Sequence, residues 1–161
     1  MKTILLIRHA EAVSVSGLPD RDRPLTGEGR SQAAEIASLA GRRGLVPELI
    51  VVSPAKRAQQ TALQMATVWR LHQTSTWKDN LLYDGNIEAY IEVLESLPES
   101  YSIVAVIAHN PAIGQLAAQF SAGAVQAFPP CGVAAFLVQT ETWADCSTAF
   151  RQLIMFAVPG A

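Results

Sequence analysis

The chain has 161 residues, half of them hydrophobic, and carries a formal net charge of −2 at pH 7. This length and composition suit one domain with a sizeable core, so we expect a single domain over residues 1–161. The slightly acidic balance argues against a general polyanion-binding role, and therefore against nucleic acid as a partner.

The first apolar run, residues 4–7, is too short for a signal peptide, and no later run reaches the length of a membrane span. Cys131 and Cys146 stand in no metal-binding or redox spacing. They predict free thiols in a reducing compartment, although a disulfide between them stays open. We therefore expect a cytoplasmic protein without membrane contact, and nothing in the sequence requires more than a monomer.

Buried strands alternate with amphipathic helices along the chain. In chain order we expect a strand over 4–7, a helix over 29–42, a strand over 49–52, a helix from 53 to about 70, a short strand over 74–77, a helix over 87–97, a strand over 103–108, a helix opened by Asn110-Pro111, and strands over 133–138 and 153–158. Ser53 should cap the second helix, with Pro54 in its first turn. The alternation predicts a three-layer α/β sandwich with a mostly parallel central sheet.

Three of the expected strands run directly into reactive or cationic residues. The first ends in Arg8 and His9, the second leads to Arg57 in the first helical turn, and the third ends in His109 and Asn110. Open α/β sheets bind ligands outside the carboxyl ends of their strands. The sequence therefore brings two histidines and two arginines to the edge where a site is expected.

Arg57 gives a further indication of what this site binds. A cation in the first turn of a helix opposes the helix dipole, and a bound anion would reverse that cost. An ordinary solvated pair, Lys56-Arg57, is the alternative interpretation. His72 has no partner motif, so we expect it at the surface.

Among the reactions open to two histidines and two arginines, phosphoryl transfer fits best. A metal centre is disfavoured because no HxH, HExxH or Cys-His spacing occurs and the arginines would repel a cation. A Ser-His-Asp triad is disfavoured because no GxSxG element occurs. Neutral imidazole is a good nucleophile for phosphorus near pH 7, and arginine forks bind phosphoryl oxygens. We therefore expect neither a metal ion nor another cofactor.

At these residues the chain resembles the histidine phosphatase superfamily, the branch that includes the cofactor-dependent phosphoglycerate mutases. The matching pieces are Leu6-Ile7-Arg8-His9-Ala10-Glu11, Arg23-Pro24-Leu25-Thr26-Gly27-Glu28-Gly29, Ser53-Pro54-Ala55-Lys56-Arg57-Ala58-Gln59-Gln60-Thr61-Ala62, His109-Asn110-Pro111 and Cys131-Gly132-Val133-Ala134. The third block is specific, and the pieces follow one another in the order of the family. Within the superfamily the chain is most similar to the short, SixA-type phosphohistidine phosphatases.

The resemblance implies His9 as the nucleophile and Arg8, Arg57 and His109 as phosphate ligands. It also implies Arg23 as a further phosphate contact. The alternative is that Arg23 is a loop residue bonded to the nearby Asp20 or Asp22. Asn110, next to His109, is a candidate phosphate contact as well.

Larger members of the superfamily carry an insertion that covers the site and holds an acidic proton donor, whereas residues 78–86 are brief here. The resemblance therefore implies a compact phosphoglycerate mutase-like fold without a large lid. Asp84 is the nearest candidate acid, although Asp84-Gly85-Asn86 also suits a turn and a helix start. Glu11 could reach the pocket rim or cap the following segment.

A weak or missing acid limits which leaving groups the site can release. An alkoxide leaving group needs a positioned proton donor, whereas phosphohistidine releases imidazole, a better leaving group. The expected activity is hydrolysis of phosphohistidine on a protein, such as a histidine-phosphotransfer domain, through a phosphorylated His9. A small-molecule phosphatase acting on a phosphoester and a non-catalytic phosphate-binding adaptor remain the alternatives.

Overall fold

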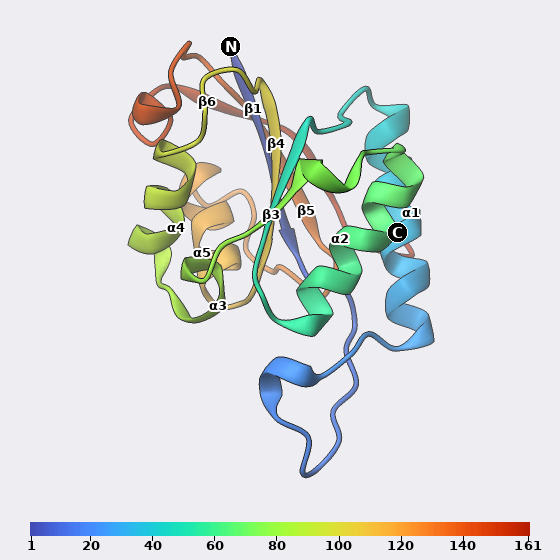
Figure 1. The fold of residues 1–161 in the computed structure, drawn as a ribbon. Coiled ribbons are helices and arrows are strands. Elements are labelled where there is room, and N and C mark those ends of the chain that lie inside the picture. The colour runs from blue at the N-terminus through green and yellow to red at the C-terminus, as the bar shows by residue number, and fades with distance from the viewer.

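A six-stranded sheet lies at the centre of the computed structural model, which describes residues 1–161 (Figure 1). The strand order is β3-β2-β4-β1-β5-β6. The first four strands are parallel to one another, and the last two join antiparallel. The strands are β1 (Lys2–Arg8), β2 (Leu49–Val52), β3 (Thr76–Lys78), β4 (Ile103–Ala108), β5 (Val133–Val138) and β6 (Arg151–Ala157).

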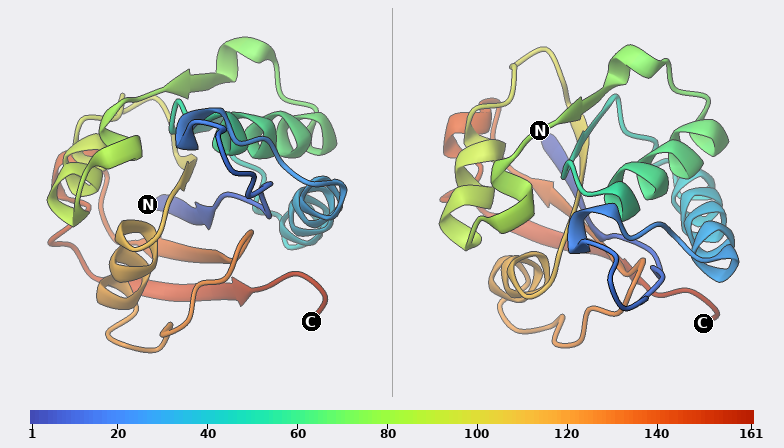
Figure 2. Two further views of the ribbon diagram at one scale, coloured as in Figure 1. Left: turned by 90° about the horizontal axis from the view of Figure 1, so that it is seen from below. Right: turned by 60° about the horizontal axis from the view of Figure 1, so that its bottom comes forward.

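Helices cover both faces of the sheet, as Figures 1 and 2 show. They are α1 (Gly27–Arg42), α2 (Lys56–Trp69), α3 (Leu81–Asp84), α4 (Ile87–Glu95) and α5 (Ala112–Phe120). Alternate side chains of β1 divide between two buried clusters: Leu5 and Ile7 pack with α1 and α2, while Ile4 and Leu6 pack with α4 and α5. Burial on both faces explains why the central strands are unbroken apolar runs. The expected three-layer α/β sandwich, compact and without a large insertion, is confirmed.

Most expected elements are present, with shifted ends. β2, β4 and β5 have the expected bounds, whereas β3 starts two residues late and β6 two residues early. The helix starts at α1 and α4 have a local cause, because Thr26 and Asn86 accept hydrogen bonds from the backbone of Gly29 and Ala89. Asn86 therefore starts a helix, as one interpretation of the 84–86 stretch predicted.

The predicted cap of α2 is wrong. The helix begins at Lys56, its cap position is Ala55, and no side chain caps it. Ser53 lies before the helix, where its hydroxyl contacts His109 instead. Arg57 nevertheless lies in the first turn of α2, as expected.

The chain after β1 is held tightly against α1. Ala12 and Leu25 form an isolated bridge, and the Thr26 backbone N–H donates to the Glu11 carbonyl. A Cβ on Gly29 would collide with that same carbonyl oxygen, so only glycine permits this approach. This close contact explains why the motif that begins at Arg23 ends in a glycine at position 29.

The two cysteines are free and buried, and they belong to different core clusters. Burial raises the pKa of each thiol to about 12. The free-thiol prediction is therefore confirmed. No helix combines the length and apolarity needed to cross a membrane.

Candidate active site

The carboxyl ends of three neighbouring parallel strands meet at one edge of the sheet. Arg8 is in register with Ala108, and Val52 with Ile107, so the residues that follow these strands are brought side by side. The His9 backbone N–H donates to the Ala108 carbonyl over 3.0 Å. The parallel register thus places the ends of β1, β2 and β4 together.

A pocket of about 400 Å³ lies at this edge. Its lining residues are Arg8, His9, Glu11, Ala12, Asp20, Arg23, Arg57, His109, Asn110 and Pro130. Six of the seven site residues predicted from the sequence are therefore brought together here. Asp84 is the exception: its side chain is exposed at the end of α3 and does not line the pocket. His72 is exposed, as expected.

A hydrogen bond of His9 determines which ring nitrogen is unprotonated. His9 Nδ1 lies 2.8 Å from the Ala10 carbonyl oxygen, which can only accept, so Nδ1 carries the proton. Nε2 therefore holds the lone pair, and Arg57 Nε donates to it over 3.3 Å. The neutral ring presents Nε2 as a nucleophile on the pocket side.

Both pocket histidines are neutral at pH 7. Burial lowers the pKa of His9 to about 3, and the charges of Arg57 and Arg8 add to this effect, while its bond to Ala10 opposes it. Burial also lowers the pKa of His109 to about 4, with Arg57 as the next cause. Their rings are near neighbours, with centroids 5.1 Å apart.

The neutral histidines predict that the protein loses stability in mild acid. Between pH 6.5 and about 4 an unfolded chain protonates both imidazoles while the folded protein does not, so the free energy of unfolding falls as the pH is lowered. At ~1.4 kcal/mol per pH unit and group, His109→Gln should remove roughly 2 kcal/mol of the loss between pH 6.5 and 4.5. Urea unfolding at a series of pH values measures this, with His72→Gln as the surface control. An unchanged pH dependence in His109→Gln would contradict the neutral, buried state.

Two buried donor sites in the pocket residues have no partner. They are Arg8 Nε and His109 Nδ1. His109 Nε2 lies 2.7 Å from the Ser53 hydroxyl, which also accepts from the Ala55 backbone N–H and can donate its own proton to the ring. In that arrangement Nδ1 of His109 carries a hydrogen. A buried polar atom without a partner costs free energy, and both atoms belong to residues that line the pocket.

Asp20 lines the pocket, although the sequence indicated only a possible bond to Arg23. Its carboxylate accepts from Arg57 Nη2 at 3.1 Å, from Arg23 Nη2 at 3.0 Å and from the Tyr83 hydroxyl at 2.9 Å. Its backbone carbonyl accepts from Arg57 Nη1 over 2.7 Å. Burial alone would raise the pKa of Asp20, but the bonds from Tyr83 and Arg23 and the charge of Arg57 lower it to about 2. Asp20 is therefore a carboxylate that holds both arginines at the pocket.

Arg23 was expected either to contact phosphate or to be a loop residue bonded to Asp20 or Asp22, and its position fits both. It is bonded to Asp20 and to the Val13 carbonyl, and it also lines the pocket. Asn110 has structural partners as well: its side chain accepts from the Gly114 N–H and donates to the Phe128 carbonyl. Glu11 lies at the pocket and accepts from the Thr26 hydroxyl, which ties it to the start of α1.

No motif in the sequence singles out Tyr83, the neighbour of the candidate acid Asp84. Its ring meets the His109 ring edge to face, with centroids 5.7 Å apart, and the Arg21 guanidinium lies 5.2 Å from the centre of the tyrosine ring. Its position next to the candidate acid is the one feature of the sequence that could have drawn attention to it. Its hydroxyl reaches Asp20 across 63 positions of sequence, which no local pattern predicts.

This set of residues matches a known family. The family model described as histidine phosphatase superfamily (branch 1) matches residues 4–81, a range that contains Arg8, His9, Arg23 and Arg57. Over these residues the chain is similar to the histidine phosphatase superfamily. It is a phosphatase.

A sequence relative and two solved structures are similar to the chain over most of its length. The chain is 28% identical to the phosphohistidine phosphatase SixA of Escherichia coli (strain K12) over 123 residues, which are 74% of each protein. It is 26% identical to the structure of a proposed phosphohistidine phosphatase SixA from Agrobacterium tumefaciens, with 99% of each chain covered and a TM-score of 0.82. The fold is also that of a proposed SixA from Nakamurella multipartitia, with a TM-score of 0.88, 23% identity, and 99% and 97% of the two chains covered.

Proposed function

We propose that this phosphatase hydrolyses phosphohistidine on a protein through a phosphorylated His9. The observation that carries the proposal is the His9 ring, whose Nδ1–H is fixed by the Ala10 carbonyl so that Nε2 has its lone pair in a cationic pocket. A neutral nucleophile beside positive charge suits attack on an anionic phosphoryl group. The name of the E. coli relative supports the same substrate class.

The proposed reaction has two steps. His9 Nε2 attacks the phosphorus of the substrate phosphohistidine, a new P–N bond forms, and the substrate P–N bond breaks. The imidazole that leaves takes its proton from water, and the hydroxide that remains is neutralised by the proton released in the second step. Water then attacks the phosphorus on His9 Nε2, which releases inorganic phosphate and restores the neutral ring.

The pocket cations stabilise the charge of the phosphoryl oxygens in both steps. Arg57 and Arg8 offer permanently charged donors, and Nδ1 of His109 offers a neutral one. The carboxylate of Asp20 holds Arg57 and Arg23 when the pocket is free, and we infer that a phosphoryl group competes with it for these guanidinium groups. Arg23 and Asn110 are proposed as further contacts to the phosphate.

A protein substrate is supported by the surroundings of the pocket. The 78–86 stretch contributes no residue to the pocket lining, and its acid, Asp84, is exposed elsewhere. Asp20 is ionised, because its pKa is about 2. A reaction whose leaving group needs no strong acid fits these facts better than hydrolysis of an alkyl ester.

A substrate panel tests the proposal. Turnover of phosphohistidine peptide and aryl phosphates should exceed that of alkyl phosphates by about 100-fold or more in kcat/KM, because the alkoxide lacks a proton donor. Asp84→Asn should change the phosphohistidine rate less than about twofold, since Asp84 lies outside the pocket. A strong preference for a sugar phosphate would contradict the protein substrate and indicate a small phosphoester instead. A loss confined to alkyl esters in Asp84→Asn would identify Asp84 as an acid.

Metal dependence is a separate test. Three arginines line the pocket, and no group of three or more His, Cys, Asp or Glu side chains is arranged to hold a metal ion. Guanidinium groups take the part that a divalent cation plays in many phosphoryl transfers. Dialysis against EDTA should therefore leave kcat/KM for phosphohistidine peptide within about twofold of its starting value. A large loss restored by Mg²⁺ or Zn²⁺ would contradict this mechanism.

A further inference from the structure

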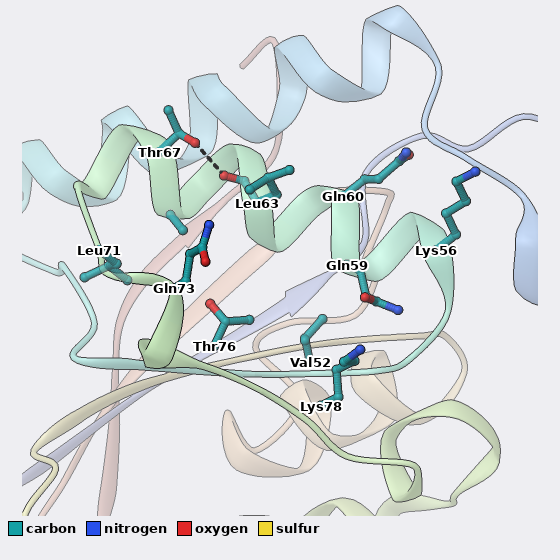
Figure 3. A pocket seen from close by; sticks show the side chains of 11 residues that line it. Val52, Lys56, Gln59, Gln60, Leu63, Thr67, Leu71, Gln73, Thr76 and Lys78 are labelled. Atoms are coloured by element: carbon teal, nitrogen blue, oxygen red, sulfur yellow. Dashed lines mark hydrogen bonds between the residues drawn. The ribbon is translucent and has the colours of Figure 1, made fainter.

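A groove of about 630 Å³ lies beside α2 (Figure 3). One wall is α2, and the other is formed by residues 71–78, which lead from the end of α2 into the edge strand β3. The groove shares no lining residue with the active-site pocket. It therefore needs an explanation of its own.

One end of the groove is cationic. Lys56 and Lys78 lie on opposite walls toward the same end, as Figure 3 shows. Both are exposed, neither forms an ion pair, and no acidic residue lines the groove. Two unpaired ammonium groups facing one concave surface favour an anionic occupant.

The rest of the groove offers apolar and amide contacts. Leu63 is 61% exposed, and Leu71 lies toward the other end of the groove from the lysines (Figure 3). Gln59 Nε2 donates to the Pro54 carbonyl, and Gln60 Oε1 accepts from the Leu25 N–H. The amide oxygen of Gln59 and the amide nitrogen of Gln60 remain free for a partner. Such a surface suits a peptide segment that mixes apolar and acidic side chains.

The cationic end of the groove lies toward the active site. Lys56 directly precedes Arg57 in the first turn of α2. Lys78 is paired in register with Val52, the last residue of β2, and the next residue, Ser53, contacts His109. A macromolecule whose phosphoryl group reaches His9 therefore has this end of the groove directly beside it.

We propose that the groove docks an acidic segment of the phosphohistidine-bearing protein substrate. Carboxylates of that segment pair with Lys56 and Lys78, and its apolar side chains contact Leu63 and Leu71. The inference rests on the proposed function and adds a recognition surface to it. A small substrate that only fills the active-site pocket does not use the groove.

Steady-state kinetics of a charge-reversed variant test the inference. The protein probe is a histidine-phosphotransfer domain phosphorylated on histidine, with acidic residues around that histidine, and the small probe is phosphoramidate. Lys56→Glu with Lys78→Glu should raise KM for the protein about tenfold, with kcat nearly constant, because the changed charges act on association. Its kcat/KM for phosphoramidate should stay within about twofold. Leu63→Ser should raise KM for the protein by roughly threefold, as a second and uncharged variant.

The matched control is Arg42→Glu with Arg43→Glu, an exposed pair at the end of α1 with the same change in net charge. It should leave both substrates nearly unchanged. An equal rise in KM in the control and the groove variant would mean that only net charge matters, and would overturn the docking surface. Unchanged kinetics of the groove variant would also overturn the docking surface. An equal loss of activity on phosphoramidate would overturn it too, because it would assign the lysines to the active site. Failure of the wild-type protein to hydrolyse the phosphorylated domain while it hydrolyses phosphoramidate would instead overturn the proposed protein substrate, and the docking inference with it.

Discussion

Replacing His9 with alanine should lower kcat for phosphohistidine peptide by about 10⁴-fold or more, because the variant has no group at which the phosphoenzyme can form. The wild-type protein, quenched rapidly during turnover, should carry a phosphoryl group that is labile in acid and stable in base. Peptide mapping should place it on His9. The His9 side chain is buried at the end of β1, so thermal unfolding must show that the variant remains folded.

His72→Ala is the matched control for this experiment. His72 is exposed and its ring contacts only Thr74, so the substitution should leave kcat and the phosphoenzyme unchanged. A phosphoryl group found on another residue, or near-normal turnover by folded His9→Ala, would exclude the proposed nucleophile. The pocket would then need a different route to phosphate release.

Arg57→Lys should lower kcat/KM by roughly 100-fold although it preserves the positive charge. Arg57 uses its guanidinium in three directions: Nε donates to His9 Nε2, Nη1 to the Asp20 carbonyl and Nη2 to the Asp20 carboxylate. A single ammonium group cannot make this planar set of contacts. The variant should also bind vanadate more weakly, which a titration against activity measures.

The comparison for Arg57 is Arg42→Lys at the exposed end of α1, where no pocket contact exists. This control should keep the wild-type kcat/KM and vanadate affinity. Equal activity of Arg57→Lys and the wild type would mean that only charge is required at this position. A lower melting temperature without a kinetic change would make Arg57 a residue that supports the fold through Asp20.

Several features of this protein are determined by the sequence alone. Strands β1, β2 and β4 are buried on both faces, which requires continuous apolar runs, and such runs are visible without a structure. Parallel strands gather their carboxyl ends at one edge, so Arg8, His9, Arg57 and His109 could be assigned to one site from their positions after strands. The family motifs added Arg23, which the structure places in the same pocket.

Other features depend on contacts between distant parts of the chain. Asp20 meets Arg57 across 37 positions and Tyr83 across 63, along a loop whose path no periodic pattern encodes. The same limit explains why Asp84 was a candidate and Tyr83 was not: the backbone direction after β3 determines which of the two contacts Asp20 and His109. Ser53 was expected to cap α2 because Ser-Pro often begins a helix, yet the hydroxyl contacts His109 instead. Local sequence determined the strands and the residues at their ends. Only tertiary packing decided which nitrogen of His9 is unprotonated, which groups bind the pocket arginines, and where the groove beside α2 lies, because each depends on atoms that come together only when the chain is folded.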